Sequence, residues 1–440
     1  MRSPKMRNLF SKLNGGKFLV ELISLHGTQI ANIIIPLIML PILGKSLGAK
    51  AYGSYIVIQS LIIIASLVIE YGFNFSGTRL ISKHFDNRAV QTQIVSKIVG
   101  AKVLLSILVV FLAAILAILQ WQKFSLYEIT IISIGALSLG WYPIWYFQGK
   151  GNLAKFATFD VIIKSLSVIL TLVLVKESSD LHIALLLSIA ASFTSALFGN
   201  IKILSEIGKI KIDFSESIKM MIDEKDMAIY RILSSSIGNT SSLILSAFSS
   251  TTTVAVYSGA EKLASGSRFF IMPFNQVFFT RVSRYGKDNI LKARREFLFS
   301  LALLMLISFL TMTIGWIFAP FLVEIFLGSE FSSTIEIMRY LLMITPIFVL
   351  GNTLSMQWMV PLGFDKQYNT IIATGAIISL ALMIFIIPRF GPLGMVIITG
   401  SVELLICAMM MIYLIKLDLN PFLRSQNFQP ETTASQQEQQ

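Results

Sequence analysis

The sequence predicts an all-α integral membrane protein of about twelve transmembrane helices. Of its 440 residues, 55% are hydrophobic and only 14% are charged, whereas a typical soluble domain is about a quarter charged. Apolar runs of about 20 residues, the length needed to cross a hydrocarbon core roughly 30 Å thick, recur along the chain. Short polar connectors separate these runs, which indicates a multi-pass helical bundle.

The polar breaks divide the apolar runs into twelve predicted spans. The first run follows a basic segment, as in a secretory signal, but it is too long, contains His26, Gln29 and Asn32, and lacks a small-residue cleavage pattern. We therefore interpret it as the first helix. The spans are predicted at residues 18–43, 52–76, 98–119, 127–147, 153–175, 181–204, 227–248, 253–280, 297–326, 335–360, 367–388 and 393–415.

The basic residues predict the orientation of the bundle. Of the 36 Lys and Arg residues, 23 lie in the N-terminus, the alternate connectors and the C-terminus, five lie in the opposite loops and eight lie inside spans. Short cytoplasmic connectors carry an excess of Lys and Arg. An even number of spans with this bias places both termini in the cytoplasm.

The longest interior connector predicts two halves. It covers residues 205–226 and mixes charges of both signs between two sets of six spans. We predict a cytoplasmic N-terminus at 1–17, a first lobe at 18–204, a cytoplasmic linker at 205–226, a second lobe at 227–416 and a disordered cytoplasmic tail at 417–440. The tail is polar and lacks apolar periodicity.

Several classes of function lack the residues they need. The chain has no G-x-x-x-x-G-K-[ST] phosphate loop, so no nucleotide hydrolysis is expected. Cys407 is the single cysteine and the three histidines are far apart, so we expect no metal site and no cofactor. The net charge of +12 is spread over connectors, which argues against nucleic acid. The predicted outer loops are too short for a catalytic domain.

Charges inside the predicted spans are the candidates for function. A charge at the centre of a spanning helix costs about 2.5–3.5 kcal/mol on insertion scales, so such residues usually face a cavity or a partner. Asp160 and Lys164 are four residues apart and share a helical face, which permits an ion pair. Glu261 and Arg268 are about two turns apart on one side of a predicted helix, and Lys262 points about 100° away.

Four further charges lie in or near spans. Arg231 and Glu70 are placed close to the cytoplasmic surface, Arg339 enters its helix from the outer side, and Glu403 lies near the centre of the last span. Cations in a low-dielectric cavity suit a phosphate or diphosphate. The alternative is that these groups neutralise one another between packed helices, or that the residues near an interface extend to water.

An aromatic cluster, WYPIWYF at 141–147, ends the fourth predicted span. We interpret it as part of the aromatic belt found at membrane interfaces. Stacking against a sugar is the alternative.

Four stretches of the chain resemble the polysaccharide-unit flippases of the Wzx type, within the multidrug/oligosaccharidyl-lipid/polysaccharide (MOP) exporter superfamily that includes the multidrug and toxin extrusion (MATE) transporters. The second stretch begins with Glu70 where relatives commonly have Asp, which preserves the carboxylate. The stretches are PLIMLPILGKSLGAKAYGSY from Pro36, EYGFNFSGTR from Glu70, PIWYFQGKGNLAKFATFDVIIKSL from Pro143 and VAVYSGAEKLASGSRFFIMPFNQVFFTRVSR from Val254.

The resemblance implies two six-helix bundles forming a V-shaped cavity that opens alternately to each side of a bacterial inner membrane. It implies an oligosaccharide linked to undecaprenyl diphosphate as the substrate, with a polysaccharide polymerase and a chain-length regulator as candidate partners. The residues expected to hold the diphosphate are Lys164, Lys262, Arg268, Arg231 and Arg339. The residues expected to couple ions or form internal ion pairs are Asp160, Glu261, Glu403 and Glu70.

Other functions stay open at this point. A multidrug antiporter of the same fold would need a carboxylate-rich, aromatic cavity, whereas cations here are at least as frequent as carboxylates within the spans. A lipid II flippase would differ only in cargo. A membrane enzyme would need an acid, base or metal set on a long loop, and a passive scaffold should tolerate neutralisation of its intramembrane cations.

Overall fold

The computed structural model describes residues 15–118, 124–286 and 289–423, and every regular element in these ranges is helical. The predicted all-α class is therefore confirmed for the described residues. The chain divides into two compact units, residues 1–243 and 244–440, with the boundary inside helix α10. The predicted division at the 205–226 connector stays a prediction.

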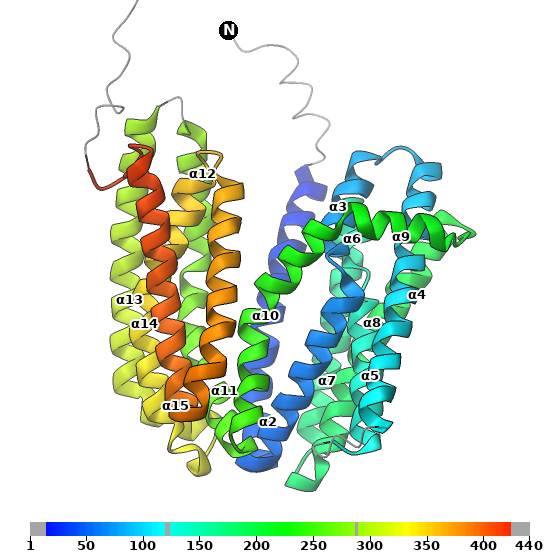
Figure 1. The fold of residues 1–440 in the computed structure, drawn as a ribbon, viewed down its shortest axis with the longest axis horizontal. Coiled ribbons are helices and arrows are strands. Elements are labelled where there is room, and N and C mark those ends of the chain that lie inside the picture. The colour runs from blue at the N-terminus through cyan, green and yellow to red at the C-terminus, as the bar shows by residue number, and fades with distance from the viewer. Residues whose placement is uncertain (1–14, 119–123, 287–288, 424–440) are drawn as a thin grey trace, which may run out of the picture. The chain divides into compact units, whose positions relative to one another are not determined.

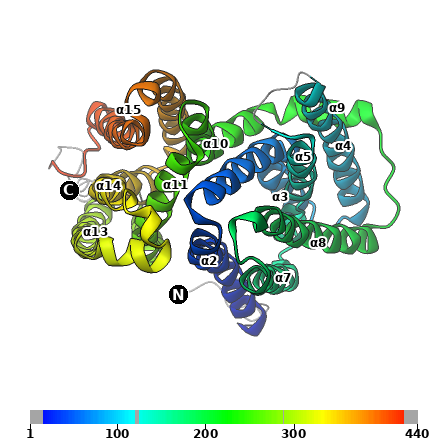
Figure 2. The ribbon, with the colours of Figure 1, turned by 90° about the horizontal axis from the view of Figure 1, so that it is seen from below.

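Unit 1 contains the helices up to Leu243, in the last third of α10. The pairs α2 with α5, α2 with α7, α7 with α8 and α4 with α9 are in contact, and Figures 1 and 2 show these helices side by side. The elements are α2 (Gly15–Glu70), α3 (Phe73–Lys83), α4 (Arg88–Ile118), α5 (Leu126–Gly140), α6 (Ile144–Gly149), α7 (Leu153–Leu174), η1 (Ser178–Asp180), α8 (Leu181–Ile207), α9 (Phe214–Asp223) and α10 (Lys225–Phe248).

Two glycines set the course of the chain in α2 and after it. Gly48 has φ 69° and ψ 173°, so α2 consists of two legs, in agreement with the predicted break between the first two spans. Tyr71 and Gly72 both have positive φ and form the turn into α3. A Cβ at Gly72 would lie 3.0 Å from the carbonyl oxygen of Met227, so only glycine lets the turn approach α10 this closely.

The predicted aromatic belt at 141–147 is wrong for its second half. Trp145, Tyr146 and Phe147 are each 3% exposed or less and pack in the core of unit 1. The predicted continuous helix at 127–147 is also wrong, because α5 ends at Gly140 and α6 starts after Pro143. Proline lacks the backbone N–H and clashes with the preceding turn, so it separates the two helices.

Helix α9 lies across unit 1 and packs on α4. A Cβ at Gly100 would lie 2.2 Å from Ser217 Oγ, so the helices meet at a glycine where small residues permit close approach. The opposite face of α9 exposes Phe214, Ile218 and Ile222, spaced four residues apart. The connector predicted at 205–226 thus contains an amphipathic helix.

Unit 2 contains the remaining helices. Helix α14 contacts α11, α13 and α15, and α12 contacts α13. Helix α15, the longest of unit 2, is divided at Gly391, which has φ 54° and ψ −131° and lies near Pro388 and Pro392. The elements are α11 (Thr251–Gly266), η2 (Ser267–Phe270), α12 (Met272–Tyr285), α13 (Ile290–Phe326), η3 (Ser329–Phe331), α14 (Thr334–Leu354), the π-helix η4 (Ser355–Met359) and α15 (Asp365–Lys416).

The predicted single helix at 253–280 is wrong. Helix α11 ends at Gly266, one 3₁₀ turn follows, and α12 begins with a proline in its first positions. Proline is tolerated at the start of a helix but not in its interior, so a break here is expected on physical grounds. Arg268 therefore lies in the 3₁₀ turn and not on the helix that carries Glu261.

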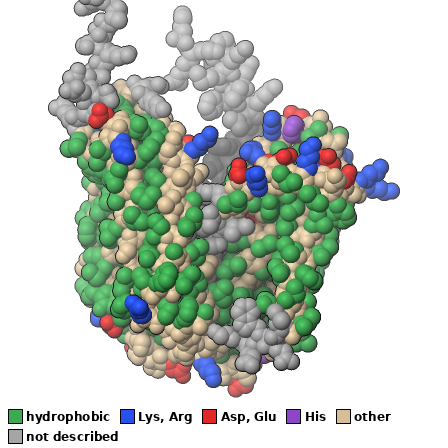
Figure 3. Space-filling model, in the orientation of Figure 1, with side chains coloured by type: hydrophobic (Ala, Val, Ile, Leu, Met, Phe, Trp, Pro, Cys, Tyr) green, Lys and Arg blue, Asp and Glu red, His purple; other side chains and the backbone are tan. Residues whose placement is uncertain are grey.

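The helices have the surface of membrane spans. Eight of them within the described residues are long and apolar enough to cross a bilayer, and two of these, about 50 residues each, contain the breaks at Gly48 and Gly391. In Figure 3, hydrophobic side chains cover the sides of the helices and charges gather towards their ends. The protein is a multi-pass membrane protein. The count of twelve and the cytoplasmic termini stay predictions, and residues 1–14 and 424–440 lie outside the described residues.

Candidate functional site

Asp160 and Lys164 form the ion pair that their spacing permits. Lys164 Nζ lies 2.7 Å from Asp160 Oδ2 on α7. Asp160 is fully buried, whereas the Lys164 side chain is 26% exposed. The ammonium also lies 5.5 Å from the centre of the Tyr142 ring. One end of Lys164 is thus fixed by a buried carboxylate and an aromatic face, and the side chain keeps a path to the surface of unit 1.

Glu70 and Arg231, predicted separately, are brought together in unit 1. Arg231 Nε donates to Glu70 Oε1 at 2.9 Å, and Arg231 Nη2 lies 3.4 Å from Oε2. The guanidinium also lies 5.4 Å from the centre of the Phe75 ring. This two-pronged contact ties the end of α2 to α10, because an arginine fork matches the two oxygens of a carboxylate.

Lys102 belongs to the same region and sequence reasoning missed it. It is 3% exposed on α4 and donates to the carbonyl oxygen of Gly140 at 2.8 Å. It also interacts electrostatically with the carboxylate of Glu70. The signal was a lysine within an apolar run, and the burial of its ammonium shows that it turns inward.

Arg268 is a partly buried cation in unit 2. Its guanidinium carbon lies 4.0 Å from the centre of the Phe348 ring. Its Nε is buried and has no hydrogen-bond partner among the described residues. Stacking on an aromatic face holds a guanidinium while leaving its N–H groups in the plane free to bind an acceptor.

Two carboxylates act on Arg268 from different helices. Glu403 on α15 has the larger electrostatic interaction with the Arg268 guanidinium, and Glu261 on α11 has a smaller one. Lys262 in turn interacts electrostatically with Glu261. Glu261, Arg268 and Glu403 are therefore electrostatically coupled within unit 2, even though the helix predicted to carry both Glu261 and Arg268 is broken.

Arg339 is engaged elsewhere in unit 2. Its Nε donates to the carbonyl oxygen of Trp316 on α13 at 3.2 Å, and its guanidinium lies 5.5 Å from the centre of that tryptophan ring. These contacts on α13 hold the side chain at the helix surface. The structure does not bring Arg339 into the cluster around Arg268.

Buried and partly buried amides form a second polar feature of unit 2 that sequence reasoning missed. Asn275 on α12 donates to Asn352 on α14 at 2.7 Å and accepts from Gln357 at 2.7 Å. Gln357 is fully buried in the π-helix η4. π-Helical turns are often found at functional sites. Isolated amides in apolar runs carry no spacing signal, so only the fold reveals this chain of hydrogen bonds.

No group of His, Cys, Asp and Glu residues suited to a metal ion occurs in the described ranges. The polar groups buried between apolar helices are instead ion pairs, stacked cations and amides. A multi-pass helical membrane protein with such interior clusters has the character of a transporter.

Comparison with known proteins gives the family. The model of the polysaccharide biosynthesis protein family matches residues 19–286, and the MatE model matches residues 227–358. The chain belongs to the polysaccharide biosynthesis protein family, and the resemblance to Wzx-type flippases of the MOP superfamily is confirmed.

Curated relatives and solved structures agree with this assignment. The chain is 24% identical over 398 residues to a "Putative O-antigen transporter" of Escherichia coli K12, covering 89% of this chain and 95% of that protein. A protein of the same name from Shigella dysenteriae is 26% identical, covering 90% and 98%. Both relatives are transporters by name, so the prediction of a transporter in place of an enzyme is confirmed.

The fold is that of known MOP transporters. The lipid II flippase MurJ in an inward closed conformation superposes with a TM-score of 0.68 at 12% identity, covering 91% of this chain and 90% of that chain. An inward-facing MATE multidrug transporter gives 0.63 at 13% identity, covering 86% and 93%.

Proposed function

We propose that the protein is a flippase that carries an oligosaccharide linked to undecaprenyl diphosphate from the cytoplasmic to the outer face of a bacterial inner membrane. Membership of the polysaccharide biosynthesis family and the names of the curated relatives support a surface polysaccharide repeat unit, such as that of O-antigen, as the cargo. The cargo has a lipid tail that can stay in the bilayer, whereas its diphosphate and sugars need a polar passage.

The observation that carries this proposal is Arg268, whose guanidinium stacks on Phe348 and whose buried Nε has no acceptor among the described residues. In a low-dielectric site such a donor binds a phosphate oxygen well, because charge-assisted hydrogen bonds are about twice as strong as neutral ones. Lys262 in unit 2 and Lys164 with Arg231 in unit 1 would supply further charge. Arg339, engaged on α13, is the weakest member of the set.

Transport would follow alternating access, with twelve crossings, cytoplasmic termini and a V-shaped cavity lined by both halves, as the superfamily implies. The membrane potential favours outward movement of an anionic head by about 2.3 kcal/mol per charge per 100 mV. A proton or sodium ion arriving at Glu261 or Glu403 would reduce the negative charge around Arg268 and so strengthen its attraction for the diphosphate. Asp160 and Glu70 are the corresponding candidates in unit 1.

Transport of defined polyprenyl-diphosphate sugars into proteoliposomes, with and without imposed proton, sodium and potential gradients, tests the function. Lipid II serves as the competing cargo and an organic cation tests the multidrug alternative. We expect movement of the oligosaccharide lipid only. Preferred transport of lipid II, or of the organic cation, would replace the proposal with that alternative.

The role of the cations is tested in cells that depend on this protein for surface polymer. Lys262→Ala combined with Arg268→Ala should abolish the polymer at normal protein levels. Arg284→Ala, at the exposed end of α12, is the matched control and should leave it intact. Full export by the double variant would refute the phosphate-binding role. Comparing export in strains with and without the polymerase and the chain-length regulator tests whether these proteins act with the flippase.

A further inference from the structure

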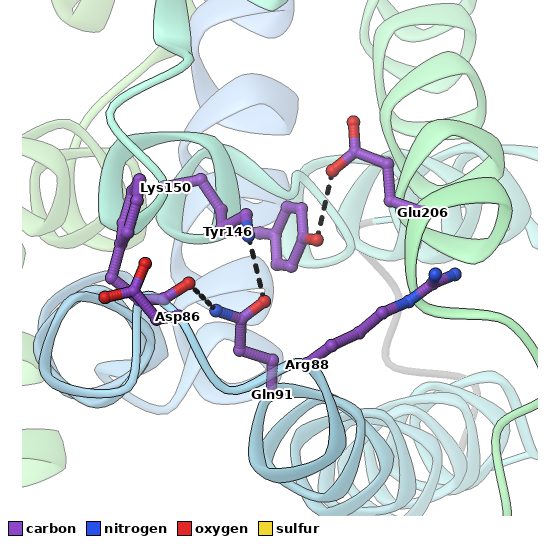
Figure 4. Close-up of a pocket in the computed structure, with 7 residues that line it drawn as sticks. Asp86, Arg88, Gln91, Tyr146, Lys150 and Glu206 are labelled. Atoms are coloured by element: carbon purple, nitrogen blue, oxygen red, sulfur yellow. Dashed lines mark hydrogen bonds between the residues drawn. The ribbon is translucent and has the colours of Figure 1, made fainter.

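A polar cavity of about 280 Å³ lies at one end of unit 1, away from the ion pairs described above. Its walls come from four segments: the turn between α3 and α4, the first turn of α4, the helix α6 and the last turn of α8 (Figure 4). These segments are the ends of candidate membrane spans. The cavity therefore lies where the headgroups of a surrounding bilayer would be.

Two buried polar side chains form the floor of the cavity. Gln91 is 1% exposed, and its amide nitrogen donates to the carbonyl oxygens of His84 and Phe85 at 2.7 and 2.6 Å. Its amide oxygen is thereby turned towards Lys150, whose ammonium donates to it at 3.0 Å. Tyr146, also 1% exposed, donates from its hydroxyl to Glu206 at 3.1 Å. The floor is rigid because each member is anchored.

The walls carry opposite charges that do not meet. Lys150 lies on one side of the Tyr146 ring and Glu206 on the other (Figure 4). Lys150 is held by a neutral amide and by the Phe85 ring, 5.3 Å from its ammonium. Within the described residues, neither Lys150 nor Glu206 belongs to an ion pair shorter than 4 Å. An ammonium has three donors and a carboxylate several acceptor positions, so both keep free capacity.

The rim repeats this arrangement. Arg88 and Asp86 are both exposed and also line the cavity. The cavity thus has two cations and two carboxylates, with net charge near zero. A simple anion would be repelled by the carboxylates, and a simple cation by Lys150 and Arg88. A small zwitterion with one anionic and one ammonium group matches both walls.

We propose that this cavity binds the zwitterionic headgroup of an aminophospholipid, with the phosphate against Lys150 and Arg88 and the ammonium against Glu206 and Asp86. An apolar side chain at the cavity suits the acyl chains, because Phe85 lines it and is 52% exposed. The site is separate from the transport cations and makes the bound lipid a structural partner of α3, α4, α6 and α8.

Native mass spectrometry of the full-length protein in detergent tests the proposal with phosphatidylethanolamine, phosphatidylcholine and phosphatidylglycerol of identical acyl chains. Phosphatidylethanolamine should bind about tenfold more tightly than the other two. The quaternary ammonium of phosphatidylcholine has no N–H to donate to the carboxylates, and phosphatidylglycerol has no cation. Soluble phosphoethanolamine and inorganic phosphate should bind at least tenfold more weakly than the ethanolamine lipid, because they lack acyl chains.

Variants locate the binding. Glu206→Gln should remove the preference for ethanolamine over glycerol headgroups. Lys150→Gln should weaken binding of the ethanolamine lipid about tenfold. Lys202→Gln, at an exposed position on α8 outside the cavity, is the matched control and should change neither. Tyr146→Phe, which releases Glu206 but keeps the ring, should retain the preference and shows that the fold tolerates change here.

Three results would overturn the proposal. Equal binding of the three lipids to the unmodified protein would exclude recognition of a zwitterion. Retention of the ethanolamine preference by a folded Glu206→Gln protein would place the recognition elsewhere. Soluble phosphoethanolamine or phosphate binding as tightly as the lipid would assign the cavity to a free metabolite.

Discussion

The carboxylate of Glu70, the last residue of α2, accepts a hydrogen bond from Arg231 Nε in α10 at 2.9 Å, although the two residues are 161 positions apart. Their side chains are 12% and 29% exposed. The pair is therefore partly buried. It joins the first residue of the stretch EYGFNFSGTR to α10, which begins after α9.

Replacing Glu70 by Gln should lower the free energy of unfolding by about 1–2 kcal/mol, because only one partner of the contact keeps its charge and Arg231 loses its counter-charge. The lower midpoint should appear in thermal unfolding followed by size-exclusion chromatography in detergent. An unchanged midpoint would mean that water replaces the carboxylate without cost.

Exchanging the two charges, with Glu70→Arg and Arg231→Glu together, separates structure from transport. The exchanged pair should regain most of the lost stability. Export should stay impaired, because the cation that we assign to the diphosphate has moved to α2. Full export by the exchanged protein would show that Arg231 acts only through its pair with Glu70.

Lys164→Met should be more damaging to stability than Glu70→Gln. It leaves the fully buried Asp160 without its partner at 2.7 Å, and removal of one member of a buried pair costs about 3–5 kcal/mol. We expect about 2–4 kcal/mol, because Lys164 is partly exposed. Thermal unfolding of the purified variant measures this loss.

The double variant Asp160→Asn with Lys164→Gln removes both charges and provides the control. Its stability should return to within about 1–2 kcal/mol of the natural protein, because two neutral amides can hydrogen-bond at this spacing. Surface polymer should still be lost if Lys164 holds the diphosphate. A stable double variant with normal polymer would leave the pair with a structural role only.

Gly100→Ala tests the contact between α4 and α9. The added Cβ would lie 2.2 Å from Ser217 Oγ, so either Ser217 must give up its hydrogen bond to the Asp213 carbonyl oxygen or α9 must move away, at a cost of about 1–3 kcal/mol. Hydrogen exchange in residues 214–223 should accelerate. Adding Ser217→Ala removes the clashing oxygen and should restore most of the protection, whereas no rescue would place the strain elsewhere in the contact.

The sequence predicts the features that depend on local physics. Apolar runs predict the helices because the cost of exposing backbone in hydrocarbon leaves few alternatives. The Gly48 break lies between the first two predicted spans, and the pair of Asp160 with Lys164 follows from helical spacing alone. These interactions are complete within one or two turns of a single helix, so a pattern of residue types is sufficient.

Features that depend on packing between helices escape prediction. Burial of Trp145 requires α3 to pass close to α6, which Gly77 allows because a Cβ there would lie 2.8 Å from the indole ring. The contact of Lys102 with Gly140 joins two helices. The chain of hydrogen bonds through Asn275 likewise needs the π-helix to place Gln357. Residue types alone do not specify these approaches.

The contact between α9 and α4 should depend on pH through Glu216. Lys97 donates to Glu216 Oε2 at 2.6 Å, and this hydrogen bond and the charge of Lys97, with a smaller effect of Lys219, hold the pKa of Glu216 below its usual value. A carboxyl group whose pKa is lowered in the folded state stabilises that state at pH values above the unfolded pKa of about 4.3. This stabilisation is lost as the pH falls through the lower folded value.

Protection of residues 214–223 against hydrogen exchange, corrected for the intrinsic effect of pH, should therefore be constant between about pH 6 and 8 and fall below about pH 4. Lys97→Gln should lower this protection at neutral pH and remove the acid-dependent part that comes from Glu216. High salt should imitate the variant, because both side chains are substantially exposed and screening weakens such pairs. An acid loss of equal size in Lys97→Gln would mean that another carboxylate controls how α9 is held.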